Sequence, residues 1–450
     1  MTYTIWSGST NTTVGNAFNM AAGDQLQTIA GSLLATSGGN GINATGSALI
    51  EVGGTVGGLN NGIYVGTASA SDSAYIVIEK TGNVFSGPST QGIQVNGAGS
   101  HTILNAGSIQ SFGSVGYGVL TWGAGQIVNQ AGGLIQGGEG VVDDDSTATD
   151  VSSFVNYGTV TGTTYAYRGS GQGDIQIVDN EGAMVGLVYM GTNAADLVYN
   201  RGTMDATGAN GTGFSLVDSV LNNAGLMYES LSTASAVNMI TFGNHAGDYF
   251  TNSGVVAEIH AAAGSRAVSF GNGAGDILSN ESSGVIYGDV SFGSGAGDAV
   301  VNNGAIYGNV ILGNGAGDAY YGQHGHLNGN VVCGSGGDIV YSGSGYETAT
   351  AGLGNDSFYS ASGGGLVIAE TVAAQQANAL DVVNNFQVAT GELGKGTYLH
   401  LGAALSSTTL FMSDGNGGTW IAMGLGGGAY SYIDVIGVGV STVHAQTYFA

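Results

Sequence analysis

One short pattern repeats between residues 266 and 356, and it constrains the fold more than any other feature of the chain. Each copy has a short apolar run, a glycine-rich turn and a closing aspartate, as in Val-Ser-Phe-Gly-Ser-Gly-Ala-Gly-Asp, which ends at Asp298. Successive closing aspartates are 22, 20, 20 and 18 residues apart, and they are Asp276, Asp298, Asp318, Asp338 and Asp356. A period near 20 residues with a turn in every copy is typical of a stacked solenoid rather than a globular core.

Each regular coil divides into three short strands separated by the aspartate turn, an Asn-containing turn and a final glycine. Alternate strand positions face one side, so Val290, Phe292, Val300 and Ile306 are expected to point inward and form stacked columns. The sequence therefore predicts an all-β fold, a right-handed parallel β-helix (β-solenoid) of about 20–22 residues per coil with a C-terminal β-rich cap. At that period, the repeats amount to about 16 coils.

The repeat pattern is bounded by two segments of different composition. Residues 1–22 are polar with two aromatic side chains, and we expect them to cap the open end of the stack, which occupies residues 23–365. Residues 366–450 are expected to form a β-rich cap and to carry the region of a secretion signal. Within them, an Ala-rich stretch at 371–380 predicts a short helix, and Ser-Asp-Gly-Asn-Gly-Gly at 413–418 predicts a hairpin turn.

A column of asparagines repeats alongside the strands, each followed within a few residues by glycine and an apolar residue. Asparagine and glycine both tolerate the backbone of tight turns, and amides stacked at the strand spacing can bond one another. We therefore expect an asparagine ladder formed by Asn105, Asn129, Asn156, Asn180, Asn200, Asn222, Asn252, Asn280 and Asn302. The aspartate column also extends backward, through Asp174, Asp196, Asp218 and Asp248.

Charge and cysteine content exclude several classes of partner and location. The chain has 5 basic against 31 acidic residues, a formal net charge of −26, so nucleic acid and anionic membrane surfaces are unfavourable partners. Cys333 is the only cysteine, so no intramolecular disulfide can form. The N-terminus lacks the basic and apolar regions of a cleavable signal, and no apolar run approaches a membrane span of about 20 residues. We expect no membrane insertion, and either a cytoplasmic chain or export by another signal.

Two of the turns resemble a known family. Gly-Ser-Gly-Gly-Asp at 334–338 and Gly-Leu-Gly-Asn-Asp-Ser-Phe at 352–358 resemble the nonapeptide of bacterial repeats-in-toxin proteins, and the calcium motif is specific only there. The last hundred residues look like the tail that directs such proteins to type I secretion. The resemblance implies Ca2+ held by aspartate carboxylates and glycine carbonyls, with metal ligands Asp276, Asp298, Asp318, Asp338, Asp356, Gly334, Gly336, Gly352 and Gly354.

This resemblance is partial, and a second one covers more of the chain. The turns that end at Asp276, Asp298 and Asp318 have one residue more than the two matching turns. From Asn105 to Asn302 the chain looks more like the passenger β-helices of bacterial adhesins and autotransporters. A separate translocator chain is then a further possibility for export.

Stacked carboxylates need a compensating arrangement. At the strand spacing, neighbouring charges repel by about 1 kcal/mol in water and by more where water is restricted. The side chains must therefore splay outward, accept bonds from turn amides, or be neutralised by a cation such as calcium, which takes six to eight oxygen ligands. The residues alone leave amide bonding and calcium binding as alternatives.

Catalytic and other metal-binding readings find weaker support. Asp143, Asp144, Asp145 and Asp150 form an acidic segment, and Arg168 is the basic residue near it in sequence. General acid–base chemistry needs partners within hydrogen-bond reach, so a solvated acidic loop is the simpler interpretation. His324 and His326 could bind a transition metal but supply two ligands only, and surface histidines are expected. Tyr287 and Tyr307 recur at one coil position and predict a packing stack.

Together these features predict a secreted, non-enzymatic structural or adhesive β-solenoid of the bacterial cell surface, extracellular matrix or a surface layer (S-layer). We expect calcium stabilisation and self-assembly into a homo-oligomer, filament or layer, with a cell-surface glycan or neighbouring protein as partner. The alternatives are a polysaccharide-active β-helix enzyme, a lyase or hydrolase that uses residues 143–150, and an autotransporter-type passenger.

Overall fold

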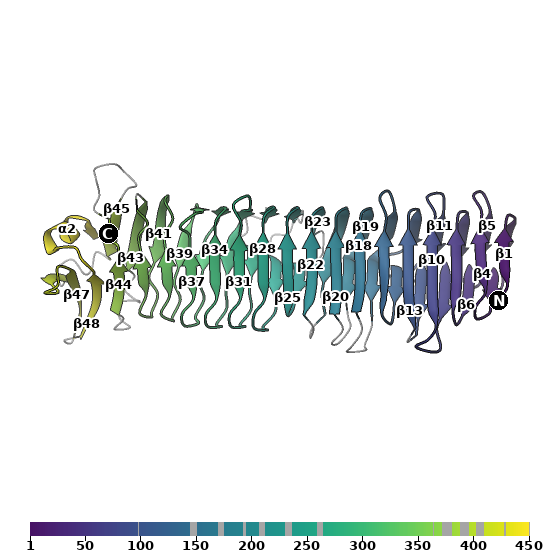
Figure 1. The fold of residues 1–450 in the computed structure, drawn as a ribbon, viewed down its shortest axis with the longest axis horizontal. Helices are drawn as coiled ribbons and strands as arrows, with labels where there is room; N and C mark the ends of the chain where they lie inside the picture. The colour runs from purple at the N-terminus through teal and green to yellow at the C-terminus, as the bar shows by residue number, and fades with distance from the viewer. Residues whose placement is uncertain are drawn as a thin grey trace. The chain divides into compact units, whose positions relative to one another are not determined.

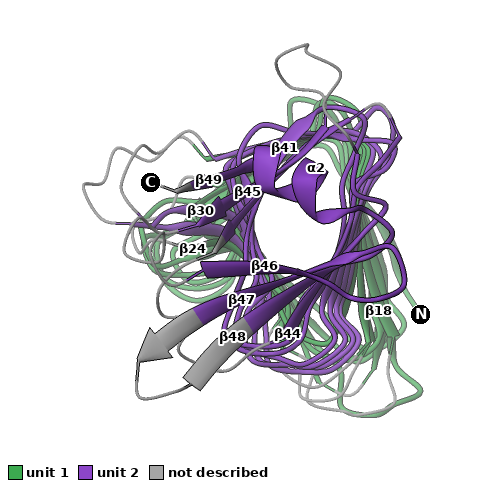
Figure 2. Cartoon of the chain, turned by 90° about the vertical axis from the view of Figure 1, so that its left-hand side faces the viewer, with its two compact units in different colours: residues 1–235 green, residues 236–450 purple. Residues whose placement is uncertain are grey.

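The computed structural model confirms the predicted fold class. The chain is 57% strand and 2% helix, and its parallel sheets form a β-solenoid of about 14 turns. The structure describes residues 1–97, 99–144, 151–169, 175–191, 195–206, 212–229, 236–258, 264–362, 364–370, 380–387, 396–401, 409–426 and 429–449. The chain divides into two compact units, unit 1 from Met1 to Ser235 and unit 2 from Ala236 to Ala450, shown in different colours in Figure 2.

In unit 1, each strand pairs in parallel with the strand at the same place in the next coil (Figure 1). One set of strands forms the first face: β1 (Tyr3–Trp6), β4 (Gln25–Thr28), β7 (Ala48–Val52), β10 (Ser73–Ile78), β13 (Ser100–Asn105), β16 (Gly125–Asn129), β18 (Val151–Asn156), β20 (Ile175–Asn180), β22 (Asp196–Asn200) and β25 (Ser219–Asn223).

The other strands of unit 1 form its second sheet. They are β2 (Ser9–Thr12), β3 (Phe18–Met20), β5 (Leu33–Thr36), β6 (Ile42–Thr45), β8 (Thr55–Gly58), β9 (Ile63–Gly66), β11 (Asn83–Ser86), β12 (Ile93–Asn96), β14 (Ser108–Ser111), β15 (Tyr117–Thr121), β17 (Leu134–Asp143), β19 (Thr159–Gly169), β21 (Ala183–Tyr189), β23 (Thr203–Asp205), β24 (Thr212–Leu216) and β26 (Leu226–Tyr228).

The register of these pairs explains the core. In β13, buried and half-buried residues alternate, so His101, Ile103 and Asn105 face inward. Ile103 pairs with Ile127 of the next coil and Asn105 with Asn129, so like residues stack directly on one another. Each coil is too small to bury an apolar face by itself, and stacking supplies the missing partner.

Unit 2 continues the same arrangement within itself. Its first face contains β28 (Tyr249–Asn252), β31 (Ile277–Asn280), β34 (Ala299–Asn302), β37 (Ala319–Tyr321), β40 (Ile339–Tyr341), β42 (Ser357–Tyr359), β44 (Leu380–Asn384), β46 (Thr409–Ser413), β47 (Thr419–Gly426) and β48 (Ala429–Val435). Its second sheet contains β27 (Asn238–Phe242), β29 (Val255–Ala257), β30 (Arg266–Ser269), β32 (Val285–Tyr287), β33 (Asp289–Ser291), β35 (Ala305–Tyr307), β36 (Val310–Ile311), β38 (His326–Leu327), β39 (Asn330–Val332), β41 (Tyr346–Thr350), β43 (Gly365–Glu370), β45 (Gly396–Leu401) and β49 (Thr447–Phe449).

The predicted inward residues of unit 2 are confirmed. Val290, Val300 and Ile306 are fully buried and Phe292 is nearly so. Aromatic rings stack along the interior, with centroids of Phe242 and Phe270 at 4.5 Å and of Phe270 and Phe292 at 4.6 Å. The predicted stack of Tyr287 on Tyr307 is also present, at 5.0 Å, on the half-exposed outside of the coil.

Beyond residue 365 the parallel pairing continues before the chain changes pattern. β43 pairs in parallel with β45, and β42 with β44. The predicted hairpin at 413–418 joins β46 and β47, which pair antiparallel, as do β47 and β48. A short helix, α2 (Val440–Ala445), follows. The helix predicted at 371–380 lies outside the described residues except for Leu380, which begins β44.

Two further points complete the comparison with the expected layout. Strands β1, β2 and β3, in the segment expected to cap the stack, pair in parallel with β4, β5 and β6. The solenoid has about 14 turns rather than about 16, since the coils of unit 1 run longer than the regular period. Among the described residues, no helix has the length and apolar character to cross a membrane.

Candidate functional site

The five closing aspartates lie at one corner of unit 2, each directly before a first-face strand. Asp276 precedes β31, Asp298 precedes β34 and Asp318 precedes β37. The sequence left open whether these side chains point outward, and they point inward, since all five are at most 1% exposed. The column they form is therefore part of the interior and not a surface row.

Backbone amides of the preceding coil hold one oxygen of these carboxylates. Oδ1 of Asp298 accepts the N–H of Asp276 at 3.0 Å, and Oδ1 of Asp318 accepts the N–H of Asp298 at 3.0 Å. Oδ1 of Asp356 accepts the N–H of Asp338 at 2.9 Å. The column thus acts as a side-chain ladder that ties each coil to the next, which accounts for an aspartate at every turn.

The closing turns are of two kinds. The long turns have six residues from first glycine to aspartate and are 271–276, 293–298 and 313–318; the short turns have five and are 334–338 and 352–356. In the short turns, the first glycine donates its N–H to the second oxygen, from Gly334 to Oδ2 of Asp338 at 2.9 Å and from Gly352 to Oδ2 of Asp356 at 2.7 Å. The extra residue of the long turns removes this bond.

The long turns consequently contain unpartnered carboxylate oxygens. Oδ2 of Asp276, Asp298 and Asp318 is buried and finds no hydrogen-bond donor among the described residues; Oδ1 of Asp338 shares this state. The ion pairs of the described chain join Arg168 to Glu139 and Arg201 to Asp179 and Glu181, all in unit 1. No described cationic side chain therefore neutralises the column.

Burial changes the titration of these groups. Loss of hydration, partly opposed by the amide bonds, raises the pKa of Asp276 to about 7, of Asp318 to about 6, of Asp338 to about 7 and of Asp356 to about 8. Burial raises the pKa of Asp298 as well. Near neutral pH the column is thus poised between a protonated and a charged state.

The glycines expected as calcium ligands are engaged by neighbouring backbone. The carbonyl oxygen of Gly334 accepts the N–H of Leu353 at 2.8 Å. Gly336 packs so closely beneath Gly354 that a Cβ at Gly354 would overlap the Gly336 carbonyl oxygen. Backbone therefore holds the short turns together without a bound ion, and calcium binding there stays a prediction.

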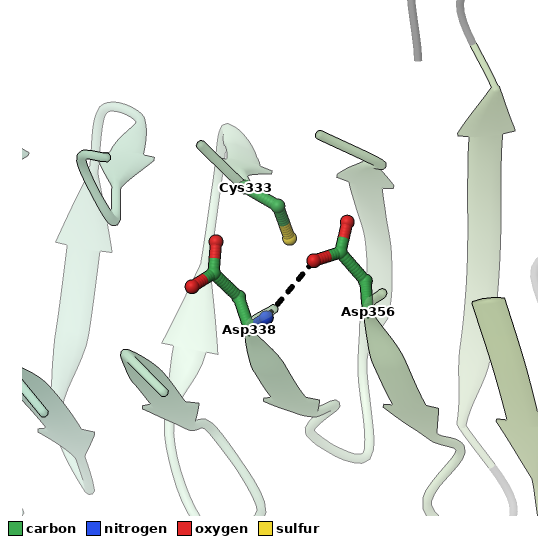
Figure 3. A group of neighbouring side chains, drawn as sticks. All are labelled: Cys333, Asp338 and Asp356. Atoms are coloured by element: carbon green, nitrogen blue, oxygen red, sulfur yellow. Dashed lines mark hydrogen bonds between the residues drawn. The ribbon is translucent and has the colours of Figure 1, made fainter. Parts of the chain in front are cut away.

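A thiol lies beside the short turns. Cys333 is buried, and its Sγ, an oxygen of Asp338 and an oxygen of Asp356 lie within 4.8 Å of one another (Figure 3). Three of the four carboxylate oxygens in this group already accept backbone N–H groups. Sulfur is a soft ligand that calcium does not favour, so the group does not fit a calcium site.

The long turns fit calcium better in donor type. Their side chains offer only oxygen, the element that calcium prefers, and they carry the negative charge that a divalent cation would balance. Each turn supplies one free side-chain oxygen, so water or turn carbonyls would have to complete six to eight ligands.

The asparagine ladder is present, with one correction. In unit 1, Nδ2 of Asn156 donates to Oδ1 of Asn180 at 2.8 Å, and Nδ2 of Asn200 donates to Oδ1 of Asn223 at 2.8 Å. The predicted member Asn222 is wrong: it is half-buried, and Asn223 takes the inward place. Asn223 stands two residues before Gly225, the spacing seen at Asn105 and Gly107, and this signal was readable in the sequence.

In unit 2 the asparagine ladder ends on a tyrosine. Asn252 bonds Asn280 and Asn280 bonds Asn302, both at 2.9 Å. Nδ2 of Asn302 then donates to the buried hydroxyl of Tyr320 at 3.4 Å, which lies 3.5 Å from Glu347. Burial raises the pKa of Glu347 to about 7. The repeat pattern gave no sign of this buried tyrosine–glutamate pair.

The aspartate column extends further than predicted at its C-terminal end. Oδ1 of Asp381 accepts the N–H of Asp356 at 2.8 Å, and Asp381 is buried. Sequence reasoning missed it because the intervening segment lengthens the step, although the apolar pair after Asp381 matches the other coils. In unit 1, Oδ1 of Asp196 accepts the N–H of Gln176 at 2.9 Å, while Asp174 lies outside the described residues.

The acidic segment at 143–150 is described only in part. Asp143 is buried at the end of β17, and Asp145 and Asp150 lie outside the described residues. Arg168 is 2.6 Å from Glu139 and 5.9 Å from the ring centre of Tyr117. The guanidinium is therefore engaged by neighbouring side chains.

The predicted histidine pair lies on the surface. His324 and His326 are exposed, and the ring of His326 contacts Tyr307 edge-on at 6.1 Å. Among the described residues, the group able to hold a metal is the one at Cys333, which contains no histidine.

Comparisons with protein-family models, with curated proteins and with solved structures find no match to this chain.

Proposed function

We propose that this chain is a secreted, non-enzymatic structural or adhesive β-solenoid of the bacterial cell surface or extracellular matrix, stabilised by calcium and self-assembling. The observation that carries the proposal is the inward carboxylate column of unit 2, which has buried, unpartnered oxygens and no described cationic partner. Such a column is stable only when protons or a cation from the medium neutralise it.

The extracellular part of the proposal follows from this requirement. Calcium sites of extracellular modules are often weak, with dissociation constants of about 10⁻⁴–10⁻³ M, and they fill only where calcium is plentiful. A chain that needs calcium for its second unit would reach full stability after export. The resemblance of the short turns and the C-terminal tail to type I-secreted proteins supports the same location.

The structural part of the proposal rests on how stabilising side chains are used. Asparagines and aspartates that could serve in a surface site instead form buried ladders between coils. The end strands of a stack carry backbone groups that can pair with a second chain, which supports assembly into a filament or layer.

The test separates stability, assembly and location. Purified full-length chain, stripped with a chelator at neutral pH, should melt at a higher temperature after addition of millimolar calcium. Sizing and electron microscopy should then show ordered assemblies, and fractionation of the producing cell should place the chain outside. An unchanged melting temperature would remove calcium, monomers under all conditions would remove assembly, and an intracellular chain would remove secretion.

The enzymatic alternative has its own decisive outcome. Asp144 is close enough to Arg168 to contribute to the raised pKa of that guanidinium, after the loss of hydration and the stronger influence of Glu139. Turnover of acidic or neutral glycans, abolished in Asp144→Asn, would overturn the non-enzymatic proposal.

A further inference from the structure

The two kinds of turn differ in what surrounds the second carboxylate oxygen. In the short turns, the amides of Gly334 and Gly352 donate to Oδ2 of Asp338 and Asp356. In the long turns, no described donor reaches Oδ2 of the aspartate. One additional residue thus leaves an oxygen of each long turn open to another partner.

The open oxygens belong to side chains that cannot avoid the interior. Asp276, Asp298 and Asp318 are each 0% exposed, and their Oδ1 atoms are held by amides of the preceding coil. A buried oxygen without a partner loses its hydration and gains nothing in return. Three such oxygens at the same place in successive coils point to a ligand that they share in kind.

The surroundings of the long turns favour a hard cation. The inward residue directly before each long turn is apolar: Phe270, Phe292 or Leu312. The corresponding residue of the first short turn is Cys333, whose sulfur suits softer metals. Arg266 is the one lysine or arginine among the described residues of unit 2, and no described ion pair links it to the column.

We propose that the long turns at Asp276, Asp298 and Asp318 are the calcium-binding turns of this chain, and that the short turns at Asp338 and Asp356 are closed by their own backbone amides. The inference rests on the calcium part of the proposed function. It reverses the preference that the sequence resemblance gives to residues 334–358.

Two matched variants of the full-length chain test this assignment. The long-turn variant is Asp276→Asn, Asp298→Asn and Asp318→Asn, and the short-turn variant is Asp338→Asn and Asp356→Asn. Asparagine keeps Oδ1 as an acceptor for the inter-coil bond and removes the charge. Circular dichroism at pH 5 in chelator first establishes that each variant is folded, and melting is then measured at neutral pH with and without calcium.

We expect the short-turn variant to keep the calcium-dependent rise in melting temperature and the long-turn variant to lose it. The reverse pattern would overturn the assignment while leaving calcium stabilisation intact. No rise in the wild-type chain would overturn calcium stabilisation itself, and the assignment with it.

A single substitution covers the case in which the long-turn variant does not fold. Calorimetric titration should find fewer calcium ions per chain in Asp298→Asn than in wild type, and the wild-type number in Asp356→Asn. Equal stoichiometry in Asp298→Asn and wild type would contradict the inference.

Discussion

Glycines of a single turn show how closely the coils of unit 2 approach. A Cβ at Gly295 would overlap the carbonyl oxygen of Gly273 in the preceding coil. Gly297, two residues later, has a positive φ of 76° and no atom within 4 Å of where its Cβ would lie. Gly295 is therefore required by contact between backbones, and Gly297 by its own conformation.

These two reasons predict different costs for the same substitution. Gly297→Ala should lower the free energy of unfolding by about 1–2 kcal/mol, the strain of an alanine in the left-handed region. Gly295→Ala should cost about 3 kcal/mol or more, because the backbone of the next coil must move. Chemical denaturation of both variants measures the difference; equal costs would show that the turns are not in tight contact.

Individual residues also show where sequence reasoning stops. A period-2 pattern predicted Val290, Val300 and Ile306 as core, because alternation in a strand assigns each side chain to one face. The direction of the aspartates was not predictable, since an aspartate in a turn can bond its own turn, another coil or a cation. The structure resolves it through amides of the preceding coil, a contact that exists only once the coils are stacked.

At the scale of a structural element, the asparagine ladder of unit 1 ties each strand end to the next coil. Asn156 accepts from Nδ2 of Asn129 at 2.8 Å, donates to Asn180 at 2.8 Å, and is fully buried. Every internal member of such a ladder serves both neighbours. Loss of one member therefore leaves two buried polar groups without their partner.

Asn156→Ala should consequently lower the free energy of unfolding by at least about 2 kcal/mol, since each orphaned buried group costs about 1–3 kcal/mol. Asn222→Ala is the matched control, because Asn222 is half-buried and its neighbour Asn223 takes the ladder position. We expect the control to stay within about 0.5 kcal/mol of wild type. Similar losses in both variants, measured by urea denaturation, would mean that the ladder contributes nothing beyond the strands.

Elements outside the strict repeat were harder to predict. The hairpin at 413–418 was predictable because its turn residues act locally. The parallel pairing of β43 with β45 was not, since the segment between them is much longer than a regular turn and hides the period. α2 follows Gly439 with no side-chain cap, so the usual sequence signal for a helix start is missing.

At the scale of the whole molecule, the acidic composition takes on a specific meaning in unit 2. Because the folded-state pKa values of Asp276, Asp318, Asp338 and Asp356 lie at about 6–8, the folded state holds protons that the unfolded state has released, whose carboxyls titrate near 3.8. The contribution to stability is full below about pH 3.8 and is lost as pH rises through about 6–8. Each such carboxyl adds a slope of about −1.4 kcal/mol per pH unit in between.

The most direct test of the account is the melting temperature of the chelator-treated, full-length chain at pH 5 and at pH 8. Wild type should melt at a lower temperature at pH 8, and Asp318→Asn should show a smaller drop because one buried carboxyl no longer ionises. Asp289→Asn removes the same net charge from a half-buried aspartate that also accepts an inter-coil amide, so it should keep the wild-type drop. A melting temperature that is equal at both pH values, or higher at pH 8, would contradict a column of buried carboxylates that must be neutralised.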